Sequence, residues 1–161
     1  MRTYTRRIAS NVQLLLMKDK LLSECALFDI QRASRVITSV YNVHLRSAGI
    51  SISQWSLLRN IAAMAPVSVG RLAEALAMER TSVTRLVEPL IELGWARSSS
   101  GDDKRVRNLE VTSKGLEKIR AGGKYWRAAQ RELLATLGER RWRTMRDALR
   151  STVRLVRQQH A

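Results

Sequence analysis

The chain has little cysteine, little proline and no long apolar run, and these shortages exclude some classes of protein. Its 161 residues include a single cysteine, Cys25, so no disulfide can form within the chain and nothing requires an oxidising compartment. The longest apolar run, residues 61–67, contains Pro66 and is far shorter than the roughly 18 residues that a membrane span needs. We therefore expect a cytoplasmic protein that does not cross a membrane.

The residue types that carry catalysis are also scarce. The two histidines, His44 and His160, do not form a cluster with Cys25 or with acidic residues at the spacing of metal ligands. Gly122-Gly123 falls within a helical pattern and does not resemble a glycine-rich loop that holds phosphate. The sequence therefore predicts a protein that is not an enzyme and has no metal site or cofactor.

Basic residues, in contrast, are in excess and give a formal net charge of +15. Such a charge favours a polyanionic partner, because each Lys or Arg placed on a phosphate releases condensed counterions. Residues 113–161 carry +9 of this charge, whereas residues 21–79 and residues 80–112 carry only +1 each. The total charge thus indicates a class of partner but does not locate the surface that binds it.

Apolar residues recur at helical spacing over residues 21–48, which predicts a long helix behind a basic arm or helix extension over residues 1–20. Ser51 and Gln54 form the pattern of a capping box, in which each side chain accepts a hydrogen bond from the backbone N–H of the other residue. They predict a second helix from Ile52 to about Ala65.

Two shorter helices and a hairpin are expected next. Ser68 can cap a helix that ends near Met78, residues 78–80 form a turn, and the following helix runs from Arg80 to Leu93 and stops at Gly94. Pro89 should bend this helix without breaking it. The side chains expected to be buried in it are Val83, Leu86 or Val87, Leu90 and Leu93. Residues 101–104 form a turn between extended stretches over 95–100 and 105–111.

Two helices are expected to complete the chain from Ser113 onward, separated by Gly138. The last helix has an apolar stripe and, along another face, a row of arginines made up of Arg146, Arg150, Arg154 and Arg157. Like charges four residues apart repel by a few tenths of a kcal/mol per pair. The row is interpreted first as a solvated face, with nonspecific phosphate contacts or an acidic partner as alternatives.

The outer face of the helix that starts at Arg80 carries short polar and basic side chains in its first turns. These are Arg80, Thr81, Ser82, Thr84 and Arg85. A helix that enters the DNA major groove by its N-terminus needs such residues there, because only they reach the base edges. An ordinary solvated helix face has a similar composition, so the position between a helical turn and a hairpin is what favours DNA contacts.

Five segments in order resemble the MarR (multiple antibiotic resistance regulator) family over residues 25–120. They are RASRVITSVY, GISISQWSLL, LAEALAMERTSVTRLVEPL, LGW and DDKR followed by VTSKG. The resemblance implies a mainly α fold with a small β-hairpin wing. A winged helix-turn-helix lobe over residues 51–112 would then lie between dimerisation helices over residues 21–48 and 113–161.

The resemblance also implies a homodimer that binds a palindromic operator in double-stranded DNA, usually as a repressor released by a small aromatic effector or by oxidation. The family's wing motif Asp-x-Arg falls on Asp103 and Arg105, with Lys104 between them, and implies an arginine in the minor groove. The family's ligand pocket would be lined by Tyr41, His44, Trp55 and Arg59, with Arg59 answering a ligand carboxylate.

Cys25 does not match the cysteine of the hydroperoxide-sensing members of that family. Alignment on Arg35, Thr38 and Tyr41 places Leu27 at the sensor position, so Cys25 is interpreted as a small core residue. The large positive charge leaves one alternative function open, a basic architectural protein that binds DNA without regard to sequence.

Overall fold

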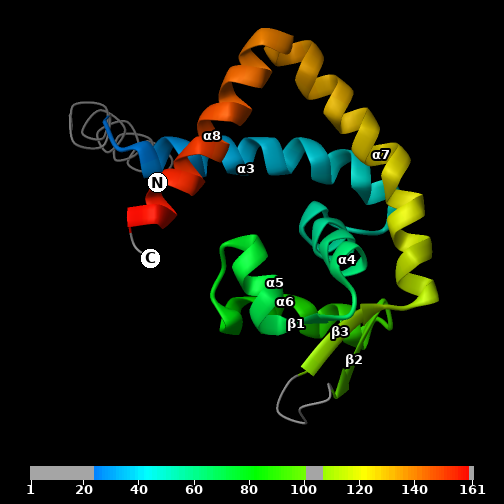
Figure 1. Cartoon of the computed structure of the whole chain (residues 1–161). Coiled ribbons are helices and arrows are strands. Elements are labelled where there is room, and N and C mark those ends of the chain that lie inside the picture. Colours follow the sequence, from blue (N-terminus) through cyan, green and yellow to red (C-terminus); the bar gives the residue numbers. More distant parts are fainter. Residues whose placement is uncertain (1–23, 101–106, 160–161) are drawn as a thin grey trace, which may run out of the picture. The chain divides into compact units, whose positions relative to one another are not determined.

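The computed structural model describes residues 24–100 and 107–159, and the chain forms two compact units, residues 1–39 and residues 40–161 (Figure 1). The basic arm expected over residues 1–20 lies outside the described residues. Helix α3, Ala26–Leu45, is shorter than the helix expected over residues 21–48, because its last residues form a separate 3₁₀ helix, η1, Arg46–Ala48. Gly49 ends η1 with a left-handed φ of 62°. Cys25 precedes α3 and is partly buried.

Helix α4, Ile52–Met64, begins with the predicted capping box. The Ser51 hydroxyl accepts a hydrogen bond from the backbone N–H of Gln54 at 3.2 Å, and the Gln54 side-chain oxygen accepts one from the backbone N–H of Ser51 at 3.0 Å. The N–H of Ile52 is bonded by the side-chain oxygen of Asn42 at 2.8 Å, a contact that the local pattern did not indicate. Three side chains thus satisfy the start of α4, where helical N–H groups lack backbone partners.

The helix-turn-helix consists of α5, Val69–Leu76, and α6, Arg80–Glu92. The Ser68 hydroxyl caps α5 by accepting a hydrogen bond from the N–H of Arg71 at 3.2 Å. The turn begins one residue earlier than expected, at Ala77, which ends α5 in a left-handed conformation with φ of 55°. This conformation costs a residue with a β-carbon roughly 1–2 kcal/mol, which is why the sequence did not indicate it.

Helix α6 continues through Pro89, and Val83, Val87 and Leu90 are buried, as the periodicity predicts. The expectation that Leu93 is buried is wrong: its side chain is 42% exposed, because the helix ends at Glu92 and Leu93 is the capping residue. Gly94 follows with a φ of 70°, and the N–H of Trp95 bonds the carbonyl of Leu90 at 2.8 Å. This is the glycine-terminated end that the sequence indicates.

The three strands form one antiparallel sheet in the order β1-β3-β2. Strands β2, Ala96–Ser100, and β3, Arg107–Val111, are the expected hairpin, with Arg97 opposite Glu110. Strand β1, Val67–Ser68, was not predicted, because two residues are too few to show the alternation of a strand. It places Val67 opposite Leu109, and both side chains are buried.

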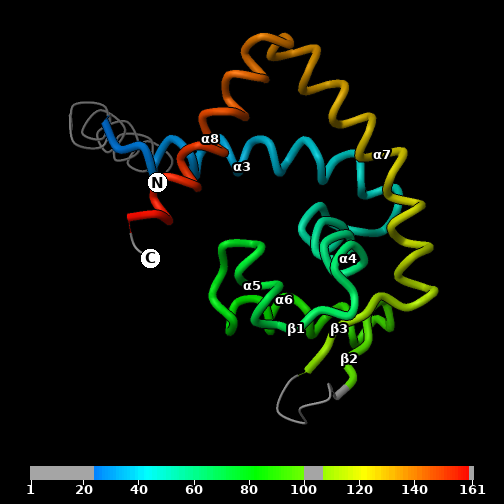
Figure 2. Tube along the Cα trace, in the orientation of Figure 1, coloured from blue at the N-terminus to red at the C-terminus, as the bar shows by residue number. Residues whose placement is uncertain are grey.

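Helices α7, Ser113–Leu137, and α8, Glu139–Gln159, complete the described chain and meet at Gly138 as expected. Figure 2 traces α4, α5, α6 and the sheet as one lobe, from which α7 leads to α8. The main hydrophobic cluster is shared by this lobe and the helices packed on it, and every buried side chain among the described residues is apolar. This apolar core fixes α6 by its inner face.

Candidate nucleic-acid interface

The first turns of α6 present the polar side chains that the sequence singles out. Arg80, Thr81, Thr84 and Arg85 are exposed, and Ser82 is half-buried. The helix is held from below by Val83, Val87 and Leu90, which are at most 3% exposed. The predicted contact residues therefore lie on one accessible face of a helix whose opposite face is anchored in the core.

The N-terminus of α6 lies beside the start of α5, and a groove of about 590 Å³ separates the two helices. Ser68, Arg71, Glu74, Arg80 and Thr81 are among the residues that line it. Glu79, the residue before α6, makes no side-chain hydrogen bond to the first N–H groups of the helix. Those N–H groups and the positive end of the helix dipole favour an anion at this point. The sequence analysis did not include Arg71 among the candidate DNA-contact residues. Its position three residues after Ser68, the cap of α5, already indicates an exposed side chain near the start of that helix.

The hydroxyl of Thr84 is already used in part, since it donates a hydrogen bond to the carbonyl of Arg80 at 3.0 Å. Its oxygen lone pairs and its methyl group remain exposed with the side chain. Thr84 is therefore suited to accept a hydrogen bond or to contact an apolar group, such as a thymine methyl, and not to donate.

The two strands of the wing, β2 and β3, lie within the described residues. Arg97 on β2 donates two hydrogen bonds to Glu110 on β3, from Nε at 2.9 Å and from Nη2 at 2.5 Å, which pair the two strands across the exposed face. The predicted wing residues Asp103, Lys104 and Arg105 lie outside the described residues. Strand β1 joins this hairpin to α5, because Val67 pairs with β3 and Ser68 is both a strand residue and the cap of α5.

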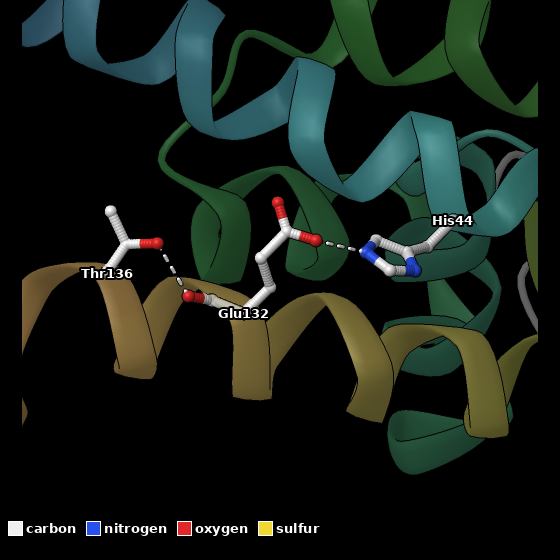
Figure 3. Close-up of polar contacts among 3 residues, drawn as sticks. All are labelled: His44, Glu132 and Thr136. Carbon is white, nitrogen blue, oxygen red and sulfur yellow. Dashed lines mark hydrogen bonds and ion pairs between the residues drawn. The ribbon is translucent and has the colours of Figure 1, made fainter.

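Two of the residues proposed for a ligand pocket make polar contacts with α7. The Tyr41 hydroxyl donates a hydrogen bond to the Gln130 side-chain oxygen at 2.5 Å, and burial raises the pKa of Tyr41 above its usual value. His44 Nε2 lies 2.7 Å from a carboxylate oxygen of Glu132. Figure 3 shows this pair, together with Thr136, whose hydroxyl donates to the Glu132 backbone carbonyl. Tyr41 and His44 thus join the end of α3 to the C-terminal half of α7.

The other two pocket candidates, Trp55 and Arg59, lie on α4. Trp55 is only 4% exposed, and its indole N–H donates to the carbonyl of Ile119 at 3.0 Å. Its ring stacks on that of Trp126 with 5.6 Å between centroids, and the Arg59 guanidinium lies 5.2 Å from the ring centroid of Trp55. Trp55, the residue that follows the capping box, is thus part of the hydrophobic core.

These four residues line neither the groove between α5 and α6 nor a second, smaller pocket. A pocket of about 300 Å³ does exist at the junction of α3, η1 and α4, but its lining is different. The residues around it are Asn42, Arg46, Gly49, Ile50, Ser51 and Gln54. The assignment of Tyr41, His44, Trp55 and Arg59 to a ligand site stays a prediction.

Within residues 24–100 and 107–159, no three His, Cys, Asp or Glu side chains are grouped so that they could hold a metal ion. In the same part of the chain, no helix is both long enough and apolar enough to cross a membrane.

Comparison with known proteins identifies relatives of this fold. The sequence pattern of the MarR family matches residues 48–106. The chain is 34% identical over 89 residues to the uncharacterized HTH-type transcriptional regulator YwoH of Bacillus subtilis, an alignment that covers 55% of this chain and 64% of YwoH. The chain thus spans just under two thirds of the length of that curated relative.

Solved structures of transcriptional regulators match over more of the chain. The M. tuberculosis regulator MosR in complex with DNA is 30% identical, with a TM-score of 0.72 over 83% of this chain and 99% of MosR. Another MosR crystal structure gives 27% identity and a TM-score of 0.71, covering 83% of this chain and 96% of that one. A mutant MarR of E. coli complexed with operator DNA, at 20% identity and a TM-score of 0.71 over 76% of this chain and 89% of MarR, shares the fold. The chain, in which α5, α6 and the β2–β3 hairpin form a winged helix-turn-helix, therefore belongs to the MarR family.

Proposed function

We propose that the protein is a transcriptional regulator that binds double-stranded DNA in a sequence-specific manner by placing α6 in the major groove. The observation that carries this proposal is the division of α6 into two faces. Val83, Val87 and Leu90 are buried, whereas Arg80, Thr84 and Arg85 are exposed on its first two turns. A relative that is 30% identical over most of this chain, MosR, has been crystallised in complex with DNA, which supports the proposal.

The polar residues in the first turns of α6 have distinct chemical roles in the proposed contact with DNA. An arginine can donate two hydrogen bonds to a guanine edge, and Arg80 and Arg85 are the candidates for that contact. Thr81 and Ser82 lie in the first turn, where hydroxyl groups reach phosphates or base edges. On the wing, Arg105 would enter the minor groove, held by Asp103, with Lys104 beside it.

Two copies of the chain would bind one operator. The terminal helices leave large apolar side chains exposed, which a single chain does not cover. They include Leu27, Phe28, Ile30, Val36 and Val43 on α3 and Leu149, Val153, Leu155 and Val156 on α8, with exposed fractions from 43% to 64%. Residues 21–48 and 113–161 are thus proposed as dimerisation segments, and residues 51–112 as the DNA-binding lobe. A twofold dimer reads a palindrome, with half-sites about one helical turn apart.

The proposed dimer acts as a repressor that a small aromatic molecule releases. The contacts of Tyr41 with Gln130 and of His44 with Glu132 connect α3 to α7, and Gln130 follows Trp126, the partner of Trp55 in the ring stack, by one turn of α7. An effector that displaced these contacts would change how the terminal helices hold the DNA-binding lobe. Arg59, exposed above Trp55, is the cation that would bind an effector carboxylate.

The test is a nuclease footprint on the DNA upstream of the gene that encodes the protein, repeated with aromatic acids and with peroxide. Two protected half-sites that persist at moderate salt and against excess unrelated DNA are the expected result. Loss of protection with an aromatic acid would support the effector. The net charge of +15 favours one other function, an architectural DNA-binding protein, and protection that disappears under competition would establish that function instead.

A further inference from the structure

Helix α8 carries many positive charges, several of them on one face, and they have no role in the proposed contact of α6 with DNA. Its 21 residues include seven arginines and only two acids, Glu139 and Asp147. Arg146, Arg150, Arg154 and Arg157 follow one another at intervals of three or four residues and so lie along one face. We call these four residues the arginine row.

The arginine row is largely without anionic partners. Among the residues that the structure describes, the ion pair on α8 joins Arg143 to Glu139, outside the row. Arg150 and Arg154 are exposed, and Arg146 is half-buried. Neighbouring arginines of the row repel one another in the free chain, and a bound polyanion would relieve this repulsion.

One end of the row is attached to the helix-turn-helix. Arg157 donates a hydrogen bond from Nη2 to the backbone carbonyl of Glu74 at 2.6 Å, near the end of α5. Glu74 also lines the groove between α5 and α6, together with Arg71 and Arg80. The arginine row therefore begins at the edge of the proposed DNA-binding lobe and continues away from it along α8.

We infer that the arginine row is a second DNA-binding surface, which contacts backbone phosphates outside the bases read by α6. Arginines four residues apart on a helix are about 6 Å apart along its axis, and the phosphates of one DNA strand follow one another at about 3.4 Å along the duplex. A helix parallel to the duplex axis thus spaces successive arginines at nearly the axial distance between every second phosphate of a strand. The inference rests on the DNA-binding function proposed above.

The location of the row favours DNA over an acidic protein. Arg157 binds the carbonyl of Glu74, which lines the groove between α5 and α6, so a duplex held at that groove would have phosphates near the Arg157 end of the row. An acidic protein would need a separate docking position beside that duplex. Phosphate contacts of this kind add affinity and salt dependence without base preference.

The experiment compares two double variants of the full chain with equal charge. R150Q/R154Q removes two arginines of the row, and R140Q/R141Q removes two exposed arginines from the first turn of α8, outside the row. Binding to a fluorescein-labelled mixed-sequence duplex of about 30 base pairs is measured by anisotropy at several salt concentrations. Thermal unfolding by circular dichroism checks that both variants are folded.

The slope of log Kobs against log[salt] should fall by about two units per protomer in R150Q/R154Q and by much less in R140Q/R141Q. Equal slopes in the two variants would overturn the inference while leaving the function of α6 intact. An unchanged DNA slope with loss of binding to labelled polyglutamate would assign the row to an acidic protein partner and would also overturn it. Failure of the unaltered protein to bind any duplex would instead reject the proposed function itself.

Discussion

Gly122 of α7 lies directly against the indole ring of Trp55 on α4. A β-carbon at position 122 would stand 2.5 Å from Cδ1 and 2.6 Å from Nε1 of Trp55, whereas one at Gly123 would meet only Arg127 Nη1, at 3.6 Å. The neighbouring glycine therefore has ordinary space around it. Close packing of α7 on α4 requires glycine at 122 and not at 123.

Replacement of Gly122 by alanine should destabilise the protein. Overpacking costs typically 1–3 kcal/mol, and this should exceed the gain of about 1 kcal/mol from alanine in a helix interior. Gly123→Ala is the matched control and should raise the free energy of unfolding by up to about 1 kcal/mol. Urea denaturation of both variants measures the difference, and equal stabilities would show that α7 does not approach Trp55 this closely.

The capping box at the start of α4 predicts a second effect on stability. Ser51→Ala should lower the free energy of unfolding by about 1 kcal/mol, because the N–H of Gln54 loses its side-chain acceptor. Ser53→Ala, at an exposed residue of the same turn that takes no part in the capping box, should change it by less than about 0.5 kcal/mol. Thermal or urea unfolding distinguishes them, and a Ser51 variant as stable as the Ser53 variant would contradict the cap.

Tyr41 should make stability fall at alkaline pH. Burial raises the pKa of Tyr41 in the folded chain above 10.0, so the unfolded chain loses its phenol proton first as the pH rises. The contribution to stability is complete below about pH 10 and is lost as the pH rises through the folded pKa. Tyr41→Phe removes this dependence, together with about 1 kcal/mol from the hydrogen bond to Gln130.

Urea unfolding of the wild-type chain and of Tyr41→Phe from about pH 8 to about pH 11 provides the measurement. The difference in stability between the two proteins should be constant at the lower pH values and should shrink at the upper ones. A difference that stays constant throughout would mean that the Tyr41 hydroxyl titrates as it does in the unfolded chain.

The proposed dimer can be tested on the apolar face of α8. Val153, 51% exposed in the single chain, would be buried against the second copy, so Val153→Asp should raise the dimer dissociation constant at least about tenfold. Thr144→Asp adds the same charge at an exposed position on the same helix and should leave the dimer unchanged. Sedimentation velocity over a range of concentrations gives both constants, and identical behaviour of the two variants would exclude this face from the interface.

Replacement of two arginines in the proposed DNA contacts should affect DNA binding in two different ways. Arg85→Ala should cost about 1–3 kcal/mol of operator affinity and relax the preference for one base. Arg105→Ala should weaken all DNA sequences alike and lower the salt slope by about one unit. Arg131→Ala, exposed on α7, serves as the control. If Arg105→Ala left both affinity and slope unchanged in a salt titration, the wing would have no part in binding.

Helix ends and helix faces in this protein follow from short stretches of sequence. The capping pairs at Ser51 and Ser68 and the glycine after α6 are predicted correctly, because each depends on hydrogen bonds between residues a few positions apart. The polar face of α6 is predicted for the same reason, since helical periodicity separates it from Val83, Val87 and Leu90.

Contacts between distant segments could not be predicted in this way. Strand β1 exists only because Val67 meets Leu109, and the hydrogen bond between Tyr41 and Gln130 joins residues 89 positions apart. The groove that places Arg71 beside Arg80 depends on how α5 packs against α6.

The sequence by itself therefore determined where the helices of the lobe begin, which side of α6 is polar and which family the chain resembles, since these follow from local bonding and periodicity. Only the tertiary structure decided that Gly122 and not Gly123 receives Trp55, and that Arg157 reaches the end of α5. These contacts depend on how whole helices are placed relative to one another, which is set by the packing of a shared core. The spacing of residues within one helix does not indicate that placement.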